Sequence, residues 1–211
     1  MPGGLYENIT LHFASDSTYY RSSDINITFL LEKLDPELTY VGPEILDLDR
    51  LMNFTLAENV SGVVSFTYNG HVYSGSVYDI INGTAALIDA TGMPKGIYDI
   101  IFTYGGDDYF YASNISVRFV VKDLPEIKLN NTGDVFENVV LNVNITANVT
   151  GTVFVYVDGF KHAKVNVTMF TGSNTVFDVD LNNVSAGNHT ITVEYLGDSI
   201  HFNNNVSMNS F

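Results

Sequence analysis

The feature that most constrains this chain is an internal repeat. One segment occurs three times at a spacing of 91 residues, so that Ile9, Ile100 and Ile191 stand at matching positions. The same spacing joins the sets Leu11, Phe102, Val193; Phe13, Tyr104, Tyr195; and Asp16, Asp107, Asp198. A repeat of this length predicts a serial array of small domains that share one fold.

A second set of matches, at a spacing of 89 residues, links the two later copies upstream of that segment. Asn59-Val60-Ser61-Gly62 lines up with Asn148-Val149-Thr150-Gly151, and Asn69-Gly70 lines up with Asp158-Gly159. The repeat is therefore about 90 residues long, which is a normal size for a small domain.

Proline marks the boundaries between the copies. Pro36 and Pro125 stand at matching positions, each three residues after a lysine. Proline fixes φ and removes a hydrogen-bond donor, which suits a short, stiff linker. The matches predict a partial repeat over 1–35 that contains terminal strands only, followed by full repeats over 36–124 and 125–211.

Apolar residues recur at every second position within each copy. The pattern is clear in Tyr98, Ile100, Phe102, Tyr104; His189, Ile191, Val193, Tyr195; Met52, Phe54, Leu56; and Val153, Val155, Val157. A period of two predicts strands with one face on a core. Asn69-Gly70 and Asp158-Gly159 predict tight hairpins, because both central residues must tolerate positive φ. About seven such strands per copy predict an all-β chain of tandem immunoglobulin-like β-sandwiches, and the lack of cysteine means that no disulfide supports them.

Composition excludes several classes of function. The chain has 9 basic and 24 acidic residues, a formal net charge of −15. Nucleic-acid binding needs clustered Lys and Arg, and anionic membrane surfaces repel such a chain. No apolar stretch approaches the ~20 residues of a spanning helix, and the start of the chain lacks the pattern of a secretory signal. We therefore expect no nucleic acid as a partner and no membrane insertion by this chain.

The closing segments of the copies carry a family resemblance. The run Gly96-Ile97-Tyr98-Asp99-Ile100 through Tyr104-Gly105-Gly106-Asp107-Asp108-Tyr109 resembles the closing strands of bacterial immunoglobulin-like repeats. The run Ala186-Gly187-Asn188-His189-Thr190 through Tyr195-Leu196-Gly197-Asp198 is similar. These repeats are abundant in the large adhesin-like surface proteins of methanogenic archaea. The resemblance implies a tandem stalk at the cell surface or cell wall, with neighbouring repeats and a surface glycan or protein as partners, and it supplies no ligand.

Thirteen Asn-x-Ser/Thr triplets stand out in the sequence. Their asparagines are Asn8, Asn26, Asn53, Asn59, Asn82, Asn114, Asn130, Asn144, Asn148, Asn166, Asn183, Asn188 and Asn205. One explanation is glycosylation of an exported protein. The other is geometric, because Asn and Ser/Thr two residues apart lie on the same outward face of a strand. Both remain open, and we expect at least some of these asparagines to carry glycan.

Three aspartates at the repeat spacing form the most interesting polar set. Asp16, Asp107 and Asp198 each follow a closing strand, where a side chain can accept a hydrogen bond from a backbone N–H two residues on. We interpret them as structural turn residues. The alternative is calcium, bound either by Asp107-Asp108 or by linker acids such as Asp35, Glu37, Asp123 and Glu126, although no Asp-x-Asp-x-Asp-Gly loop accompanies them.

An aromatic or imidazole ring follows each of these aspartates by three residues. Tyr19, Phe110 and His201 share the spacing and each precedes a second ring. An outward ring stacks on a sugar or a partner surface, so these three are candidate ligand contacts, whereas an inward ring anchors the loop.

Catalytic constellations are missing from the sequence. There is no His-Glu-x-x-His, no phosphate loop and no Gly-x-Ser-x-Gly. Lys33 and Lys122 are the candidates for a lysine–asparagine cross-link, and we expect both instead to end their strands in solvent. We therefore predict no enzyme, no cofactor other than calcium, and a stalk or interaction segment of an adhesin-like protein. The alternatives are a carbohydrate-binding module of a secreted polysaccharide-degrading enzyme and an envelope scaffold.

Overall fold

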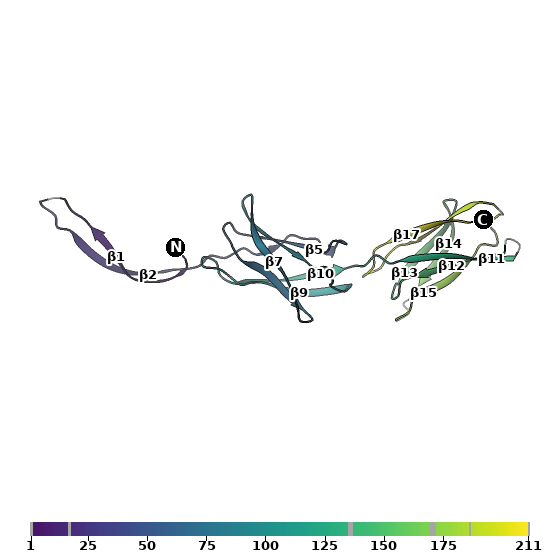
Figure 1. The fold of residues 1–211 in the computed structure, drawn as a ribbon, viewed down its shortest axis with the longest axis horizontal. Helices are drawn as coiled ribbons and strands as arrows, with labels where there is room; N and C mark the ends of the chain where they lie inside the picture. Colours follow the sequence, from purple (N-terminus) through teal and green to yellow (C-terminus); the bar gives the residue numbers. More distant parts are fainter. Residues whose placement is uncertain (1, 17, 135–136, 169–171, 186, 211) are drawn as a thin grey trace. The chain divides into compact units, whose positions relative to one another are not determined.

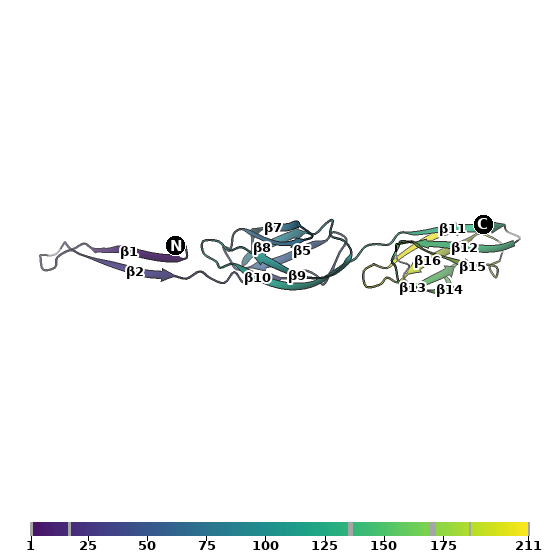
Figure 2. The same ribbon diagram turned by 90° about the horizontal axis from the view of Figure 1, so that it is seen from below.

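The computed structural model describes residues 2–16, 18–134, 137–168, 172–185 and 187–210, without the side chains of 131–138 and 210. Every helix or strand assigned within these ranges is a β-strand (Figures 1 and 2). The strands are β1 (Gly4–Phe13), β2 (Ser23–Leu31), β3 (Thr39–Tyr40), β4 (Ile45–Leu46), β5 (Leu51–Leu56), β6 (Val63–Tyr68), β7 (His71–Ile80), β8 (Gly83–Asp89), β9 (Gly96–Tyr104), β10 (Ser113–Val121), β11 (Ile127–Asp134), β12 (Glu137–Ile145), β13 (Gly151–Val157), β14 (Phe160–Val167), β15 (Thr175–Asp180), β16 (His189–Tyr195) and β17 (Asn204–Ser210). None of the described ranges holds a helix that is long and apolar enough to cross a membrane.

Strands β1 and β2 form an antiparallel, two-stranded sheet. Their register pairs Ile9 with Ile27 and Leu11 with Ile25, which places these apolar side chains on one face. A bulge interrupts the pairing between Tyr6 and Ile9, where Asn8 adopts a φ of 56°.

Strands β3 to β10 form the first sandwich, in the order β3-β5-β8-β7-β6-β9-β10-β4. Its two layers are continuous because β7 pairs with β6 through its first half and with β8 through its second half. Gly75 lies where β7 passes from one layer to the other, and a Cβ there would overlap the carbonyl oxygen of Leu87. A glycine is therefore required at this position.

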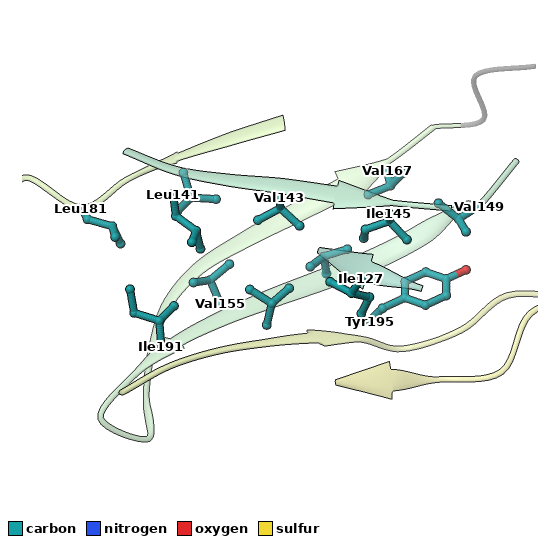
Figure 3. Packing of buried hydrophobic residues seen from close by; sticks show 13 residues of the cluster. Ile127, Leu141, Val143, Ile145, Val149, Val155, Val167, Leu181, Ile191 and Tyr195 are labelled. Atoms are coloured by element: carbon teal, nitrogen blue, oxygen red, sulfur yellow. The ribbon is translucent and has the colours of Figure 1, made fainter. Parts of the chain in front are cut away.

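Strands β11 to β17 form the second sandwich from two separate sheets, β11-β12-β15 and β14-β13-β16-β17. The inward side chains of the two sheets meet in one aliphatic core (Figure 3). Leu141, Val143 and Ile145 of β12 face Val155 of β13 and Ile191 of β16, and all five are at most 1% exposed. A valine- and isoleucine-rich core fits a strand-only sandwich, because branched side chains pack well on pleated surfaces.

The predicted alternation is confirmed in both sandwiches. Phe102 and Tyr104 are fully buried. Ile101, which precedes Phe102 in the same strand and points to the other side, is 63% exposed. The two predicted hairpins are confirmed as well. Tyr68 pairs with His71 across Asn69-Gly70, and Val157 pairs with Phe160 across Asp158-Gly159, with positive φ at all four central residues. The chain therefore has the all-β, immunoglobulin-like sandwich fold without disulfides.

Compact units in the structure differ from the three predicted segments. The residues up to Glu44, with 49–92 and 98–119, form one unit, so the opening hairpin belongs with the first sandwich rather than standing apart as 1–35. The second unit takes 120–211 together with 45–48 and 93–97, so it begins ahead of the predicted boundary at 124–125. Part of this difference has a physical reason, because linker residues 33–34 and 122–123 are hydrogen-bonded to the turns described next.

Candidate functional site

Asp107 organises the turn after β9. Its Oδ1 accepts hydrogen bonds of 2.8 Å from the N–H groups of Tyr109 and Phe110. Its Oδ2 accepts bonds of 2.9 Å from both the N–H and the hydroxyl of Ser61, which lies just ahead of β6. The carboxylate thus orders its own loop and joins it to the start of another strand. The turn interpretation of Asp107 is confirmed.

Asp198 repeats this arrangement in the second sandwich. Its Oδ1 accepts N–H bonds from Ile200 at 2.9 Å and His201 at 2.8 Å. Its Oδ2 accepts bonds of 2.9 and 3.2 Å from the N–H and the hydroxyl of Thr150. Because two turns at the repeat spacing use the same atoms, the pattern is a property of the repeat.

The linker strand entering the first sandwich is bonded to the Asp107 turn. The N–H of Leu34 donates to the carbonyl of Tyr109 at 2.8 Å, and its carbonyl accepts from the N–H of Tyr111 at 2.9 Å. Leu34 thereby forms a parallel bridge with Phe110.

The second linker strand is held in the same way. The N–H of Asp123 donates to the carbonyl of Ile200 at 3.2 Å, and its carbonyl accepts from the N–H of Phe202 at 2.9 Å. The bridge here joins Asp123 to His201. We call this assembly the linker clamp. Its members are Lys33, Leu34, Ser61, Tyr104, Asp107 and Phe110 in the first unit, and Lys122, Asp123, Thr150, Tyr195, Asp198 and His201 in the second.

The two clamp lysines correct a prediction. Lys33 and Lys122 do not end their strands in solvent, since both are partly buried. The Nζ of Lys33 donates to the backbone carbonyl of Asp107, and the Nζ of Lys122 donates to that of Asp198 at 2.7 Å. Each ammonium thus has an acceptor within the turn of its own unit. Their matching positions in the repeat were the available signal in the sequence.

Asp107 and Asp198 both have a pKa well below the usual value for an aspartate. Burial by itself raises the pKa of Asp107, but hydrogen bonds from Ser61, Tyr109 and Phe110 together lower it far more. For Asp198 burial again opposes ionisation, and donors that include the N–H groups of Ile200 and Thr150 lower the pKa. Each carboxylate is thus held ionised by the donors of the turn that it orders.

A buried tyrosine completes each clamp. The hydroxyl of Tyr104 donates to the carbonyl of Ser61, and the hydroxyl of Tyr195 donates to the carbonyl of Thr150, both at 2.8 Å. Burial, followed by the neighbouring aspartate, raises the pKa of each phenol. The tyrosines therefore remain neutral donors across the physiological range.

Asp16, the third predicted turn residue, is exposed in the turn between β1 and β2. Its counterparts Asp107 and Asp198 accept from Ser61 and Thr150, which lie 46 and 48 residues earlier in the chain.

The three candidate ligand rings have different environments. Tyr19 is 90% exposed, whereas Phe110 is 5% exposed and His201 is fully buried. His201 Nδ1 lies 2.9 Å from Asp198 Oδ1, and its Nε2 lies 2.8 Å from Nζ of Lys95, which belongs to the same compact unit. His201 therefore offers no surface to a ligand, and Phe110 offers very little, whereas Tyr19 is open to solvent.

A surface hollow of about 470 Å³ lies beside the first clamp. Leu34, Glu58, Asn59, Tyr109 and Phe110 line it. Tyr109 is 47% exposed and is the available ring there, so it replaces Phe110 as the residue of this loop that can meet a ligand.

The second sandwich contains a serine–histidine–aspartate group that the sequence pattern did not predict. His189 Nδ1 lies 2.6 Å from Asp158 Oδ2, and its Nε2 lies 3.4 Å from the hydroxyl of Ser185. The same Nε2 lies closer, at 2.8 Å, to the backbone carbonyl of Ser185, which only accepts. Hydrogen bonding to Asp158, then to Ser185, raises the pKa of His189. Because the Ser185 carbonyl only accepts, Nε2 donates to it in this geometry and is not placed to accept the serine proton, so the group closes a loop.

Four asparagines of the Asn-x-Ser/Thr triplets lie at positive φ, which by itself favours asparagine at these positions. Asn8, Asn59, Asn82 and Asn148 have φ values of 56° to 66°. Asparagine tolerates this region better than most residues. The hydroxyls two residues after Asn59 and Asn148 belong to the clamps, and that of Thr84 donates to the carbonyl of Ala57 at 3.0 Å.

Most of the other triplets lie on strands. Asn26, Asn53, Asn114, Asn130, Asn144, Asn166 and Asn205 are strand residues, and Asn183 and Asn188 lie in the loop between β15 and β16. The exposed pairs Asn26/Thr28 and Asn205/Ser207 follow the geometric explanation, with both side chains on one outward face. The side chains of the triplet after Asn130 lie outside the described residues.

The described ranges include all the carboxylates considered for calcium. They contain no group of three His, Asp or Glu side chains arranged to hold a metal ion. Both oxygens of Asp107 and of Asp198 are already used by protein donors. Calcium at the linker acids stays a prediction.

Comparisons with known proteins add little. No family model matches the chain, and no curated protein matches it. Among solved structures it is similar to the Clostridium thermocellum CbhA fibronectin(III)-like modules, with a TM-score of 0.33 and 17% identity, over 82% of this chain and 93% of that one.

Proposed function

We propose that the chain is a non-catalytic structural and interaction segment of an adhesin-like protein, presented outside the cell. The observation that supports this is the linker clamp. In both sandwiches the turn of the recurrent aspartate fixes the entering linker strand to its own domain. A segment that transmits force or sets the reach of a distal binding region needs such fixed linkers.

Pulling on single molecules tests the structural part of this proposal. We expect the full chain, held by its ends, to unfold in two separate events, each releasing roughly 250–300 Å of chain at about 3.5 Å per residue. Loss of Lys122 through Lys122→Met is expected to weaken one of the two events. A chain that extends smoothly without a force peak would contradict a role in transmitting force.

The hollow beside Tyr109 favours a second candidate, a carbohydrate-binding module. It combines an exposed ring with a carboxylate and an amide, the groups that stack on and hydrogen-bond to sugars. A glycan array with the full chain separates the candidates. The module predicts binding that is lost in Tyr109→Ala and kept in Tyr111→Ala, whereas the stalk predicts no glycan binding that depends on Tyr109.

An extracellular location is supported by the thirteen triplets. We expect protein isolated from its native source to carry glycan on exposed asparagines such as Asn114 and Asn183. Intact-mass analysis checks this, and a mass equal to that of the bare polypeptide would reject it.

A further inference from the structure

The outward face of β5 carries an asparagine among apolar side chains. Asn53 is exposed and shares this face with Leu51 and Thr55, because successive side chains of a strand alternate between its two sides. The register places Leu87 of β8 opposite Asn53 on one side. On the other side the N–H of Val41 donates to the backbone carbonyl of Asn53 at 2.9 Å. Leu51, Val41 and Leu87, which are 39%, 54% and 38% exposed, thus surround Asn53 on three sides.

The apolar area continues past the threonine of the Asn53-Phe54-Thr55 triplet. Thr55 pairs with Ala85 of β8, and Ala85 pairs in turn with Tyr78 of β7. Tyr78 is 50% exposed, so its ring extends the same outward face. Several large apolar side chains gathered on one exposed face mark a surface that something else covers.

The matching face of the second sandwich is polar. Asn142 stands at the position of Asn53 and lies between Asn130 of β11 and Asp178 of β15 in the register. Its Nδ2 donates a hydrogen bond of 2.8 Å to Oδ1 of Asp178. The run Asn142-Val143-Asn144 is not an Asn-x-Ser/Thr triplet. The triplet therefore occurs in the copy whose asparagine has apolar neighbours, and it is missing in the copy whose asparagine is bonded to a polar one.

We propose that Asn53 carries an N-linked glycan whose first sugars lie over Leu51, Val41 and Leu87. This inference rests on the extracellular location proposed above, and it assigns one triplet a role that the others do not have. A sugar ring packs its C–H groups on apolar side chains and keeps its hydroxyls in water. A glycan attached at the centre of the apolar area therefore removes that area from solvent without needing a protein partner.

The attachment uses groups that the face presents. Nδ2 of Asn53 forms a bond to the anomeric carbon of a lipid-phosphate-linked oligosaccharide, which a transferase of the source cell supplies. The bond from that carbon to the phosphate oxygen breaks, the lipid phosphate leaves, and the amide releases one proton. Thr55 provides the hydroxyl that completes the acceptor triplet, on the same side of β5.

Glycopeptide mapping of the full chain, isolated from its native source, tests the modification. We expect mass spectrometry to find glycan on Asn53. A bare Asn53 in a chain that carries glycan on other triplets overturns this inference and leaves the proposed function standing. A chain without glycan on any asparagine overturns both, so the two failures are distinguishable.

The covering role is tested with variants of the full chain produced in the same cells. Thr55→Ala removes the triplet and is expected to raise the fluorescence of Nile red, an uncharged dye of apolar surfaces, at least ~2-fold, because the uncovered side chains then face water. Thr55→Ser keeps the triplet and should leave the fluorescence unchanged. Ser116→Ala, which removes the Asn114 triplet from β10 of the same sandwich, should also leave it unchanged.

A further pair of substitutions ties the dye to this face. Val41→Thr with Leu87→Thr, added to Thr55→Ala, should return the fluorescence to that of the unmutated chain. Fluorescence that Thr55→Ala does not raise overturns the covering role, and so does a rise that persists when Val41 and Leu87 are replaced. A bare Asn53 together with self-association that Leu87→Asp abolishes would assign the face to a second copy instead and would also overturn the inference.

Discussion

At the scale of single residues, one carboxylate in each sandwich does several structural tasks. Asp107 satisfies backbone donors of its own turn and of Ser61, and its carbonyl receives Lys33. Removing such a group leaves several donors without partners, which is more damaging than losing one hydrogen bond.

Asp107→Ala is therefore expected to destabilise the first sandwich by about 3 kcal/mol, from the orphaned N–H groups. Asp108→Ala, next to it and exposed, is the control and should stay within about 0.5 kcal/mol. Chemical denaturation followed by exchange of the Tyr109 amide measures both. Equal effects of the two substitutions would contradict the assigned role.

Acid stability follows from the lowered pKa of the clamp aspartates. A folded pKa below the ordinary value of about 3.9 means that the unfolded chain binds more protons in that window. The contribution to stability is present above pH ~4 and is lost as the pH falls through the folded pKa. Melting temperatures measured from pH 6 to pH 2 should drop steeply, and the double variant Asp107→Asn, Asp198→Asn should show a shallower drop.

His189 gives the opposite dependence. Its pKa is raised by Asp158 and then by Ser185, so its contribution is fully present below about pH 6.5 and is lost as the pH rises through the folded pKa. We expect the β15–β16 loop to exchange faster at pH 9 than pH-corrected rates predict. His189→Gln should remove this excess, and His71→Gln should not. A proton titration of the His189 ring by NMR gives the folded pKa directly.

At the scale of strands and turns, the sequence identifies much of the architecture. The period of two places Met52, Phe54 and Leu56 inward, and the structure buries all three. Asn69-Gly70 and Asp158-Gly159 are hairpin turns because of a local backbone requirement. Such features depend on neighbouring residues alone and can be read from them.

The parts that were not predicted depend on residues far apart in the chain. Lys33 meets Asp107 across 74 positions, and Asp158 meets His189 across 31. The apolar period shows that a side chain points away from the core, but it does not show which hydrogen-bond partner that side chain contacts. The same limit explains Phe110 and His201, whose burial results from the linker bridge.

Gly75 allows a prediction about a whole strand. Because β7 belongs to both layers of the first sandwich, Gly75→Ala must displace β7 from the Leu87 carbonyl. We expect a loss of roughly 2–4 kcal/mol in the first sandwich from this overlap. Gly105→Ala, where an added Cβ meets open space, should be nearly neutral. Urea unfolding curves of the two variants make the comparison.

At the scale of the whole molecule, two compact units predict two transitions. Calorimetry of the full chain is expected to resolve two events, each with an enthalpy of about 60 kcal/mol for ~90 residues. Val64→Ala and Val153→Ala occupy matching, fully buried positions and should each lower only one event, by several degrees. A single transition that both substitutions shift alike would show one cooperative body.

The linker clamp also separates the length of the repeat from the length of the folding unit. Lys122 and Asp123 lie ahead of Pro125, yet they are bonded to the turn of the sandwich that follows. A recombinant piece started at the proline would contain every strand of its sheets and still lack the cation and the backbone pair that fix its last turn. Anyone who divides such a chain for expression should therefore cut before the lysine, so that each sandwich keeps the few residues borrowed from the end of its predecessor.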